Sequence, residues 1–93
     1  MVNKSIIKIR NKLDKLDNQF LDIIKKRTIL VNEVIKNKKY KKDIIDKRRI
    51  KIILKNVSKK SKKMKIDPKI TNRIWKSMIK AYIDYEFRNF GKK

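Results

Sequence analysis

A few charged residues occupy positions that the apolar pattern of this 93-residue chain does not require. Arg27 stands where the row of apolar residues from Ile6 to Val34 calls for a hydrophobic side chain. Because an unpaired buried guanidinium is costly, Arg27 needs either a carboxylate from another helix or an anionic ligand. Lys38 follows 11 residues later, within about 20° of the same helical direction and about 16 Å further along the axis. The two long cations can therefore converge on one small anion.

One acid and one further cation extend this set. Glu86 is one of two glutamates in the chain. It belongs to a row on one side of an expected helix: Trp75, Ile79, Tyr82 and Glu86. Glu86 is thus either the ion-pair partner of Arg27 or part of a polar pocket, and Arg49 adds a cation at the start of another helix. Several cations, one acid and no nucleophile suit electrostatic binding of a small polyanion rather than covalent catalysis.

The composition excludes several classes of site. The chain has no histidine and no cysteine, which rules out a Ser-His-Asp triad, thiolate chemistry and the usual zinc ligands, so no metal or other cofactor is expected. No apolar run exceeds three residues, and the first residues lack the apolar region of a secretory signal. We therefore expect a cytoplasmic protein without a membrane span.

The net charge of +21 has two interpretations. A strongly basic chain is typical of nucleic-acid binding, and the run KNKKYKK at 36–42 favours it. However, the chain has 24 lysines against six arginines, spread over its whole length and accompanied by many isoleucines. Such a skew is typical of A/T-rich codon usage, and it lacks the clustered arginines and interleaved aromatic residues of a dedicated surface. Solvated lysine-rich faces are the preferred interpretation, and nucleic-acid binding ranks third among the functions considered.

Three helices are expected to position these side chains. Alternating three- and four-residue spacing of apolar residues predicts a first helix over residues 3–38, capped by Asn3. About 35 residues rise about 50 Å, which is long compared with a compact monomer of this size. Because two short helices cannot cover that stripe, we expect a partner subunit to cover it in an interlocked homodimer.

The second and third helices carry clear start signals. The second begins near Asp43 or Asp46 and fades in the KKSKK run at 59–63. Asp67 followed by Pro68 predicts the start of the third, which runs toward a stop at Gly91. The expected fold is all-α: one domain over residues 1–93 with a long first helix.

Four stretches of sequence carry a pattern that is fairly specific in combination: IRNKLDKLDNQFLDIIKKR at 9–27, Lys38, DKRRI at 46–50, and IDPKITNRIWKSMIKAYIDYE at 66–86. Together they resemble the all-helical, type II chorismate mutase family, which includes the isochorismate-pyruvate lyases. The resemblance implies intertwined dimers of three-helix chains. It also implies a cofactor-free pericyclic rearrangement of chorismate to prephenate in aromatic amino-acid biosynthesis.

The resemblance also implies roles for individual residues. Arg27 would bind a carboxylate of the dianionic substrate, and Lys38 would donate a hydrogen bond to the ether oxygen of the breaking C–O bond. Glu86, when protonated, would donate a second hydrogen bond to that oxygen. Arg49 would hold another part of the substrate, and Arg10 would reach the active site of the opposite subunit.

Three positions depart from the common mutase pattern. Ile50 stands where many mutases carry a Glu that contacts the substrate hydroxyl, Tyr82 stands in place of Ser, and Glu86 in place of Gln. The interval from Lys38 to Arg49 is also one residue shorter. These features look closer to the isochorismate-pyruvate lyases, and also to a proteobacterial branch described as chorismate mutase. The mutase reaction on chorismate ranks first, and lysis of isochorismate to salicylate and pyruvate ranks second.

Overall fold

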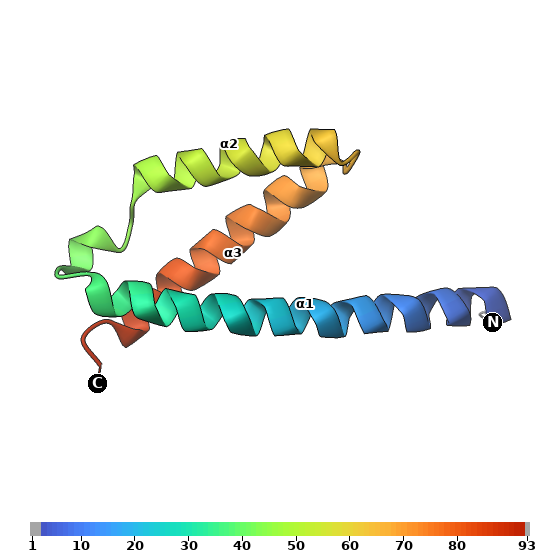
Figure 1. Cartoon of the computed structure of the whole chain (residues 1–93), viewed down its shortest axis with the longest axis horizontal. Coiled ribbons are helices and arrows are strands. Elements are labelled where there is room, and N and C mark those ends of the chain that lie inside the picture. Colours follow the sequence, from blue (N-terminus) through green and yellow to red (C-terminus); the bar gives the residue numbers. More distant parts are fainter. Residues whose placement is uncertain (1–2, 93) are drawn as a thin grey trace. The chain divides into compact units, whose positions relative to one another are not determined.

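The computed structural model of the chain describes residues 3–92, in which three α-helices and one short 3-10 helix occur and no strand. In order, the elements are α1 (Lys4–Asn37), η1 (Lys41–Asp43), α2 (Lys47–Lys63) and α3 (Pro68–Asn89) (Figure 1). This confirms the expected all-α class and the long first helix. The chain divides into two compact units: residues up to Asn32, which form most of α1, and residues from Glu33 onward, which hold the end of α1 and the other elements.

Side chains cap the start of each α-helix, which confirms the caps predicted at Asn3 and Asp67. The side-chain oxygen of Asn3 accepts a hydrogen bond from the backbone N–H of Ile6 at 2.9 Å. Asp46 accepts one from the N–H three residues later at 3.0 Å, and Asp67 accepts one from the N–H two residues later at 2.9 Å. Of the two starts considered for the second helix, Asp46 is therefore the right one, and Asp43 belongs to η1. Caps of this kind satisfy backbone donors that a helix start leaves without partners.

The helix ends also follow local chemistry. Helix α2 ends after the lysine run, and the N–H of Ile66 donates to the carbonyl of Ser61 at 2.8 Å, a bond that closes a helix end. Helix α3 ends at Asn89, and Gly91 follows with a φ of +74°, a conformation that glycine adopts without steric cost. The expected stop at Gly91 is confirmed to within two residues.

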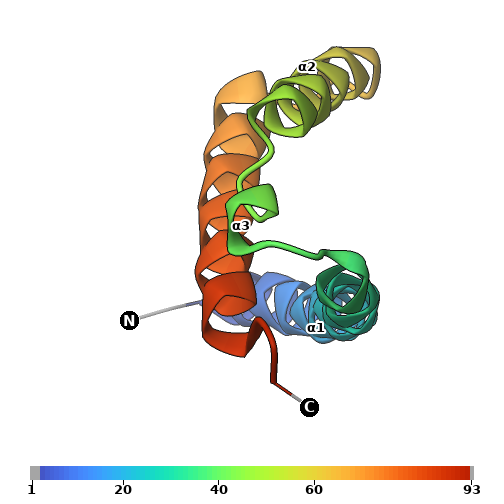
Figure 2. The ribbon, with the colours of Figure 1, turned by 90° about the vertical axis from the view of Figure 1, so that its left-hand side faces the viewer.

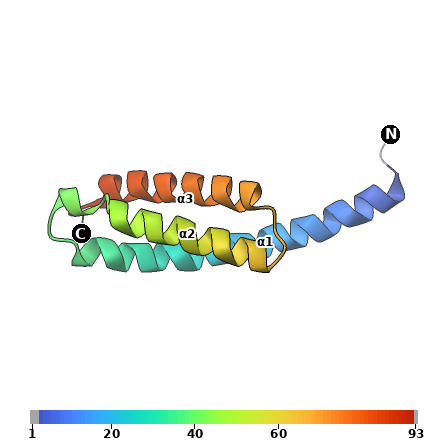
Figure 3. The ribbon, with the colours of Figure 1, turned by 90° about the horizontal axis from the view of Figure 1, so that it is seen from above.

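In the unit from Glu33 onward, α2 and α3 pack against each other as a hairpin (Figure 3). Near the connecting turn, the buried hydroxyls of Ser61 and Thr71 lie 2.7 Å apart in a hydrogen bond. Many of the apolar residues along the hairpin are half-buried, among them Ile53, Leu54 and Trp75, whereas Ile70, Ile74 and Phe87 on α3 are exposed. Only two hydrophobic residues in the described part of the chain are classed as buried, Ile35 and Ile44, so a single chain has a thin core.

The other unit is the first part of α1, and its apolar stripe is exposed. The stripe expected from the sequence is present on the helix, and its members in this unit are between 40% and 60% exposed: Ile6, Ile9, Leu13, Leu16, Phe20, Ile23 and Leu30. Its last member, Val34, belongs to the unit from Glu33 onward and is 47% exposed. A contiguous exposed apolar surface of this kind marks an interaction site. In residues 3–92, no helix combines the length and apolar content needed to cross a membrane.

Candidate anion-binding site

The structure joins Lys38 and Glu86, two of the residues that the sequence singled out. Lys38 follows the last residue of α1, and its Nζ lies 3.1 Å from Oε1 of Glu86 on α3. The same ammonium donates a weaker hydrogen bond to the backbone carbonyl of Ile44 at 3.4 Å. The segment from residue 38 to 46 lies beside the C-terminal half of α3, as Figure 2 shows. Glu86 therefore forms an ion pair with Lys38.

Both charged groups are largely removed from solvent. The side chains of Lys38 and Glu86 are 21% and 11% exposed. Burial of this extent strengthens an ion pair relative to one on the surface, but it also makes the removal of either partner costly. A lysine ammonium has three N–H donors, and two of them are used here. The third remains for a ligand, so the site can offer a positively charged donor to an anionic or ether oxygen.

Short-range structure brings Lys38 to this position. Helix α1 ends at Asn37, and the N–H of Lys38 donates to the carbonyl of Ile35 at 3.2 Å in the last turn. The chain then turns through η1, and the buried side chain of Ile44, 3% exposed, anchors the segment. Because Ile44 is fixed by its side chain, its carbonyl is held where the Lys38 ammonium reaches it. No sequence signal marks a backbone carbonyl as a lysine partner, so this contact could not be predicted.

The expected row on α3 leads to Glu86. Trp75, Ile79 and Tyr82 are half-buried, and Glu86 is the most buried member of the row. The ring of Tyr82 meets that of Tyr85 edge to face, with ring centroids 6.4 Å apart. Such an aromatic pair restricts the tyrosine one helical turn before Glu86. The row thus gives α3 an apolar and aromatic surface that ends in a carboxylate.

The N-terminal turn of α2 holds the other two expected residues of this unit. The backbone N–H of Arg49 donates to the capping Asp46, while its side chain is exposed. The next residue, Ile50, is half-buried. Within residues 3–92, the Arg49 guanidinium forms no ion pair, so it is available to an anion.

The two remaining cations lie in the first unit, on α1. Arg10 and Arg27 are both exposed, together with the apolar stripe around them. Arg27 thus lies on a stripe that has no cover in the single chain, rather than in a covered seam. Of the seven residues expected at the site, Lys38 and Glu86 are in contact.

Comparison with known families identifies the class of protein. A sequence model of the family described as chorismate mutase type II matches residues 9–87. That range covers most of the chain and contains all of the candidate site residues, and the chain belongs to this family. Comparisons with curated proteins and with solved structures gave no match. The family match supports a chorismate mutase-like function and a chorismate-like substrate.

The contact between Lys38 and Glu86 predicts a measurable coupling. In a double-mutant cycle of Lys38→Met and Glu86→Gln, we expect a coupling free energy of about 1 kcal/mol, because each charge is the partner of the other in a partly buried pair. Urea unfolding of the four proteins measures it. The control cycle uses Lys39→Met with Glu86→Gln, since Lys39 is an exposed neighbour. Equal coupling in both cycles would contradict the ion pair.

Proposed function

We propose that this protein is a chorismate mutase, which converts chorismate to prephenate without a cofactor in aromatic amino-acid biosynthesis in the cytoplasm. The observation that carries the proposal is the Lys38–Glu86 pair, which lies within the matched range 9–87 and presents a partly buried ammonium with one donor to spare. The reaction needs no acid, base or nucleophile, which agrees with a chain that has no histidine and no cysteine.

In the proposed mechanism, one C–C bond forms as one C–O bond breaks, and no proton is transferred. Arg27 and Arg49 bind the substrate carboxylates and hold the dianion in its compact, chair-like conformer. Lys38 donates a hydrogen bond to the ether oxygen, on which negative charge develops in the transition state. Glu86 donates a second one when it is protonated. Donors aimed at developing charge in a site screened from water give the largest share of the acceleration.

The complete site in this proposal needs two chains. Arg10 and Arg27 are 17 residues apart, which is about 26 Å on a helix, so one chain cannot direct both at one small ligand. An antiparallel partner helix brings Arg10 of one chain toward Arg27 of the other. The same association covers the exposed apolar stripe of α1. We therefore propose a homodimer in which residues 1–93 of each chain form a single helical domain.

Isochorismate-pyruvate lysis is the second candidate function. Two observations favour it: Ile50 is a half-buried aliphatic residue directly after Arg49, and Tyr82 is half-buried one turn before Glu86. Both side chains would line the substrate and shape its choice. Isochorismate differs from chorismate in the position of its hydroxyl. Because Ile50 cannot form a hydrogen bond to the hydroxyl of chorismate, a pocket lined by Ile50 favours chorismate over isochorismate only weakly.

The first prediction concerns turnover. We expect the purified protein to convert chorismate to prephenate, and Arg27→Ala and Lys38→Ala to lower kcat/KM about 100- to 1,000-fold, because each removes a charge that stabilises the bound dianion or its transition state. The loss of chorismate absorbance in the ultraviolet measures the rate. Lys39→Ala, at the exposed neighbouring lysine, serves as control and should retain full activity.

The same assay with isochorismate separates the two enzymes. Salicylate and pyruvate from isochorismate, with little turnover of chorismate, would replace the mutase by the lyase. No turnover of either substrate would contradict both functions.

The second prediction concerns Glu86. A carboxyl group donates a hydrogen bond only in its neutral form, whereas the side chain of Gln has nearly the same shape and always carries N–H donors. Because a hydrogen bond from position 86 to the ether oxygen stabilises the transition state in the proposed mechanism, Glu86→Gln should retain at least wild-type kcat, and Glu86→Leu, which has no donor, should lower it about tenfold or more. The ultraviolet assay measures both variants. Equal losses in the two would exclude a hydrogen bond from position 86.

The third prediction concerns the shared site. Arg10→Ala and Arg27→Ala dimers should each be nearly inactive, but a refolded equal mixture should regain about a quarter of wild-type activity. Half of the random dimers are mixed, and each mixed dimer has one site with both arginines intact. Light scattering after gel filtration should give the mass of a dimer for every sample. No recovery on mixing would mean that both arginines act within one chain.

A further inference from the structure

Helix α2 differs from the other helices in its charge. Its 17 residues include nine lysines and arginines and no acidic residue. Five of these cations recur at three- and four-residue intervals on one side of the helix, within an arc of about 80°. We call them the basic stripe: Arg48, Lys51, Lys55, Lys59 and Lys62. All five are exposed, so the stripe is a continuous positive surface about 21 Å long.

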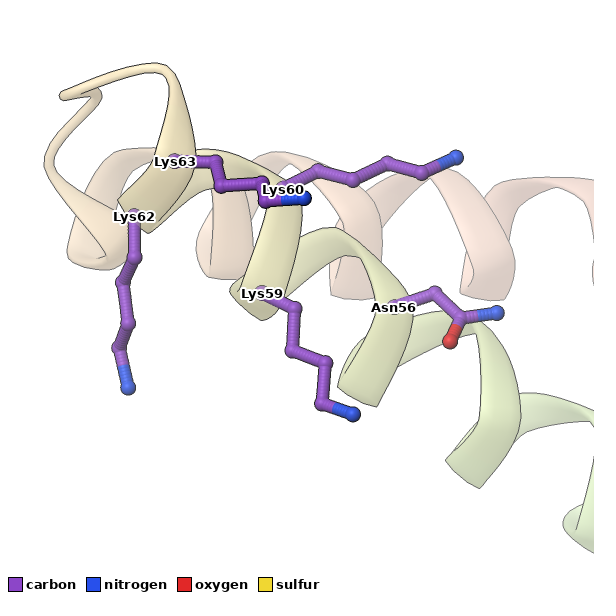
Figure 4. Close-up of a pocket in the computed structure, with 5 residues that line it drawn as sticks. All are labelled: Asn56, Lys59, Lys60, Lys62 and Lys63. Atoms are coloured by element: carbon purple, nitrogen blue, oxygen red, sulfur yellow. The ribbon is translucent and has the colours of Figure 1, made fainter.

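The opposite side of α2 is occupied by α3. The two helices pack together, with Ile53, Leu54 and Val57 half-buried and Ser61 bonded to Thr71. The register of the hairpin therefore directs the basic stripe outward. Figure 4 shows this at the C-terminal end of α2, where the side chains of Lys59 and Lys62 extend to the same side of the helix.

Neighbouring lysines widen the surface at that end. Four lysines and one amide surround an open hollow of about 410 Å³: Asn56, Lys59, Lys60, Lys62 and Lys63. No carboxylate lines the hollow. Like charges one turn apart repel each other and destabilise a helix. Phosphate groups bound along the stripe would relieve that repulsion and would release their own counterions.

We propose that the basic stripe of α2 binds the phosphate backbone of double-stranded nucleic acid without sequence preference. Lysine ammonium groups are point charges that suit phosphates, and contacts to phosphates carry no sequence information directly. A straight stripe of about 21 Å spans several phosphates of one strand, so it fits a linear polyanion rather than a small metabolite. Helix α2 has no aromatic residue on which unpaired bases would stack, which favours a duplex over a single strand.

The same geometry argues against a lipid surface. A helix that lies in a membrane interface inserts its apolar face among the acyl chains. In α2 that face packs on α3. Attraction of nucleic acid by the net charge of +21 alone would not depend on which cations are present, whereas the proposed contact lies on one side of one helix.

Helix α3 offers a matched control. It carries four exposed cations with similar spacing: Lys69, Arg73, Lys76 and Lys80. Its row continues one turn later into Asp84, so an acidic residue interrupts the positive surface. Replacing these four cations lowers the net charge by the same amount as replacing four cations of the basic stripe.

The test compares two variants of the full chain by fluorescence anisotropy with a labelled 20-base-pair DNA duplex. The stripe variant combines Lys51→Gln, Lys55→Gln, Lys59→Gln and Lys62→Gln, and the control variant combines Lys69→Gln, Arg73→Gln, Lys76→Gln and Lys80→Gln. We expect the stripe variant to lose about tenfold or more in affinity and to show a shallower salt dependence, by about one unit of slope per lost contact. The control variant should lose less than about threefold.

Two further samples complete the design. Arginine at the same four stripe positions should restore binding, and circular dichroism should show unchanged helix content in every variant. Because none of the changes touches the proposed substrate site, turnover of chorismate is an independent readout. Equal losses in the stripe and control variants would overturn the proposal in favour of net charge alone. Dependence on the stripe for binding phosphatidylserine vesicles, but not for binding the duplex, would overturn it in favour of a membrane surface.

Discussion

The length of α1 is the constraint on which the rest of the structure depends. A 34-residue helix with an apolar stripe along its length has to bury that stripe, yet 11 of its large hydrophobic residues are exposed in the single chain. Burial of apolar surface is the main favourable contribution to folding, and among residues 3–92 of a single chain Ile35 and Ile44 are the buried hydrophobic residues. A helix of this length therefore favours association, and association in turn decides which side chains meet. In the proposed homodimer, the active centre would belong to the two chains together rather than to the core of one chain.

The Lys38–Glu86 pair is the part of the proposed site that one chain builds for itself. Its members are 48 residues apart in sequence and meet because α1 ends at Asn37, the segment through η1 turns back, and α3 ends its apolar row in a carboxylate. The pair has a second consequence for the substrate. A partly buried ammonium already held by a carboxylate and a carbonyl is fixed in position before a ligand arrives, so little conformational freedom is lost on binding. The same carboxylate lowers the net positive charge that the ligand meets, which explains why further cations are needed nearby.

Whether a contact in this structure could be predicted from the sequence depends on how far apart its two partners lie along the chain. The caps at Asn3 and Asp67 were predicted because a cap acts on N–H groups two or three residues away, whereas the sequence left the start of α2 open between Asp43 and Asp46. The periodicity of α3 correctly marked Glu86 as inward-facing, but it left open whether Glu86 pairs with Arg27 or belongs to a polar pocket. The turn through η1 makes Lys38 its partner. The contact to the Ile44 carbonyl could not be predicted, because every residue has a carbonyl. The surroundings of Arg27 depend on what covers α1, which a pattern within one chain does not specify.

The composition bears on the proposed roles of the arginines. Lysine outnumbers arginine four to one in this chain, so lysine fills most positions where any cation is sufficient. Three of the six arginines, at positions 10, 27 and 49, nevertheless coincide with proposed carboxylate-binding positions. A guanidinium offers a planar pair of donors that matches both oxygens of a carboxylate, whereas an ammonium offers a single point of charge. Lys38 stands at the position proposed to meet one ether oxygen, where a point charge with one donor is the better match. The distribution of the two basic residue types therefore follows the different shapes of the groups that they are proposed to bind.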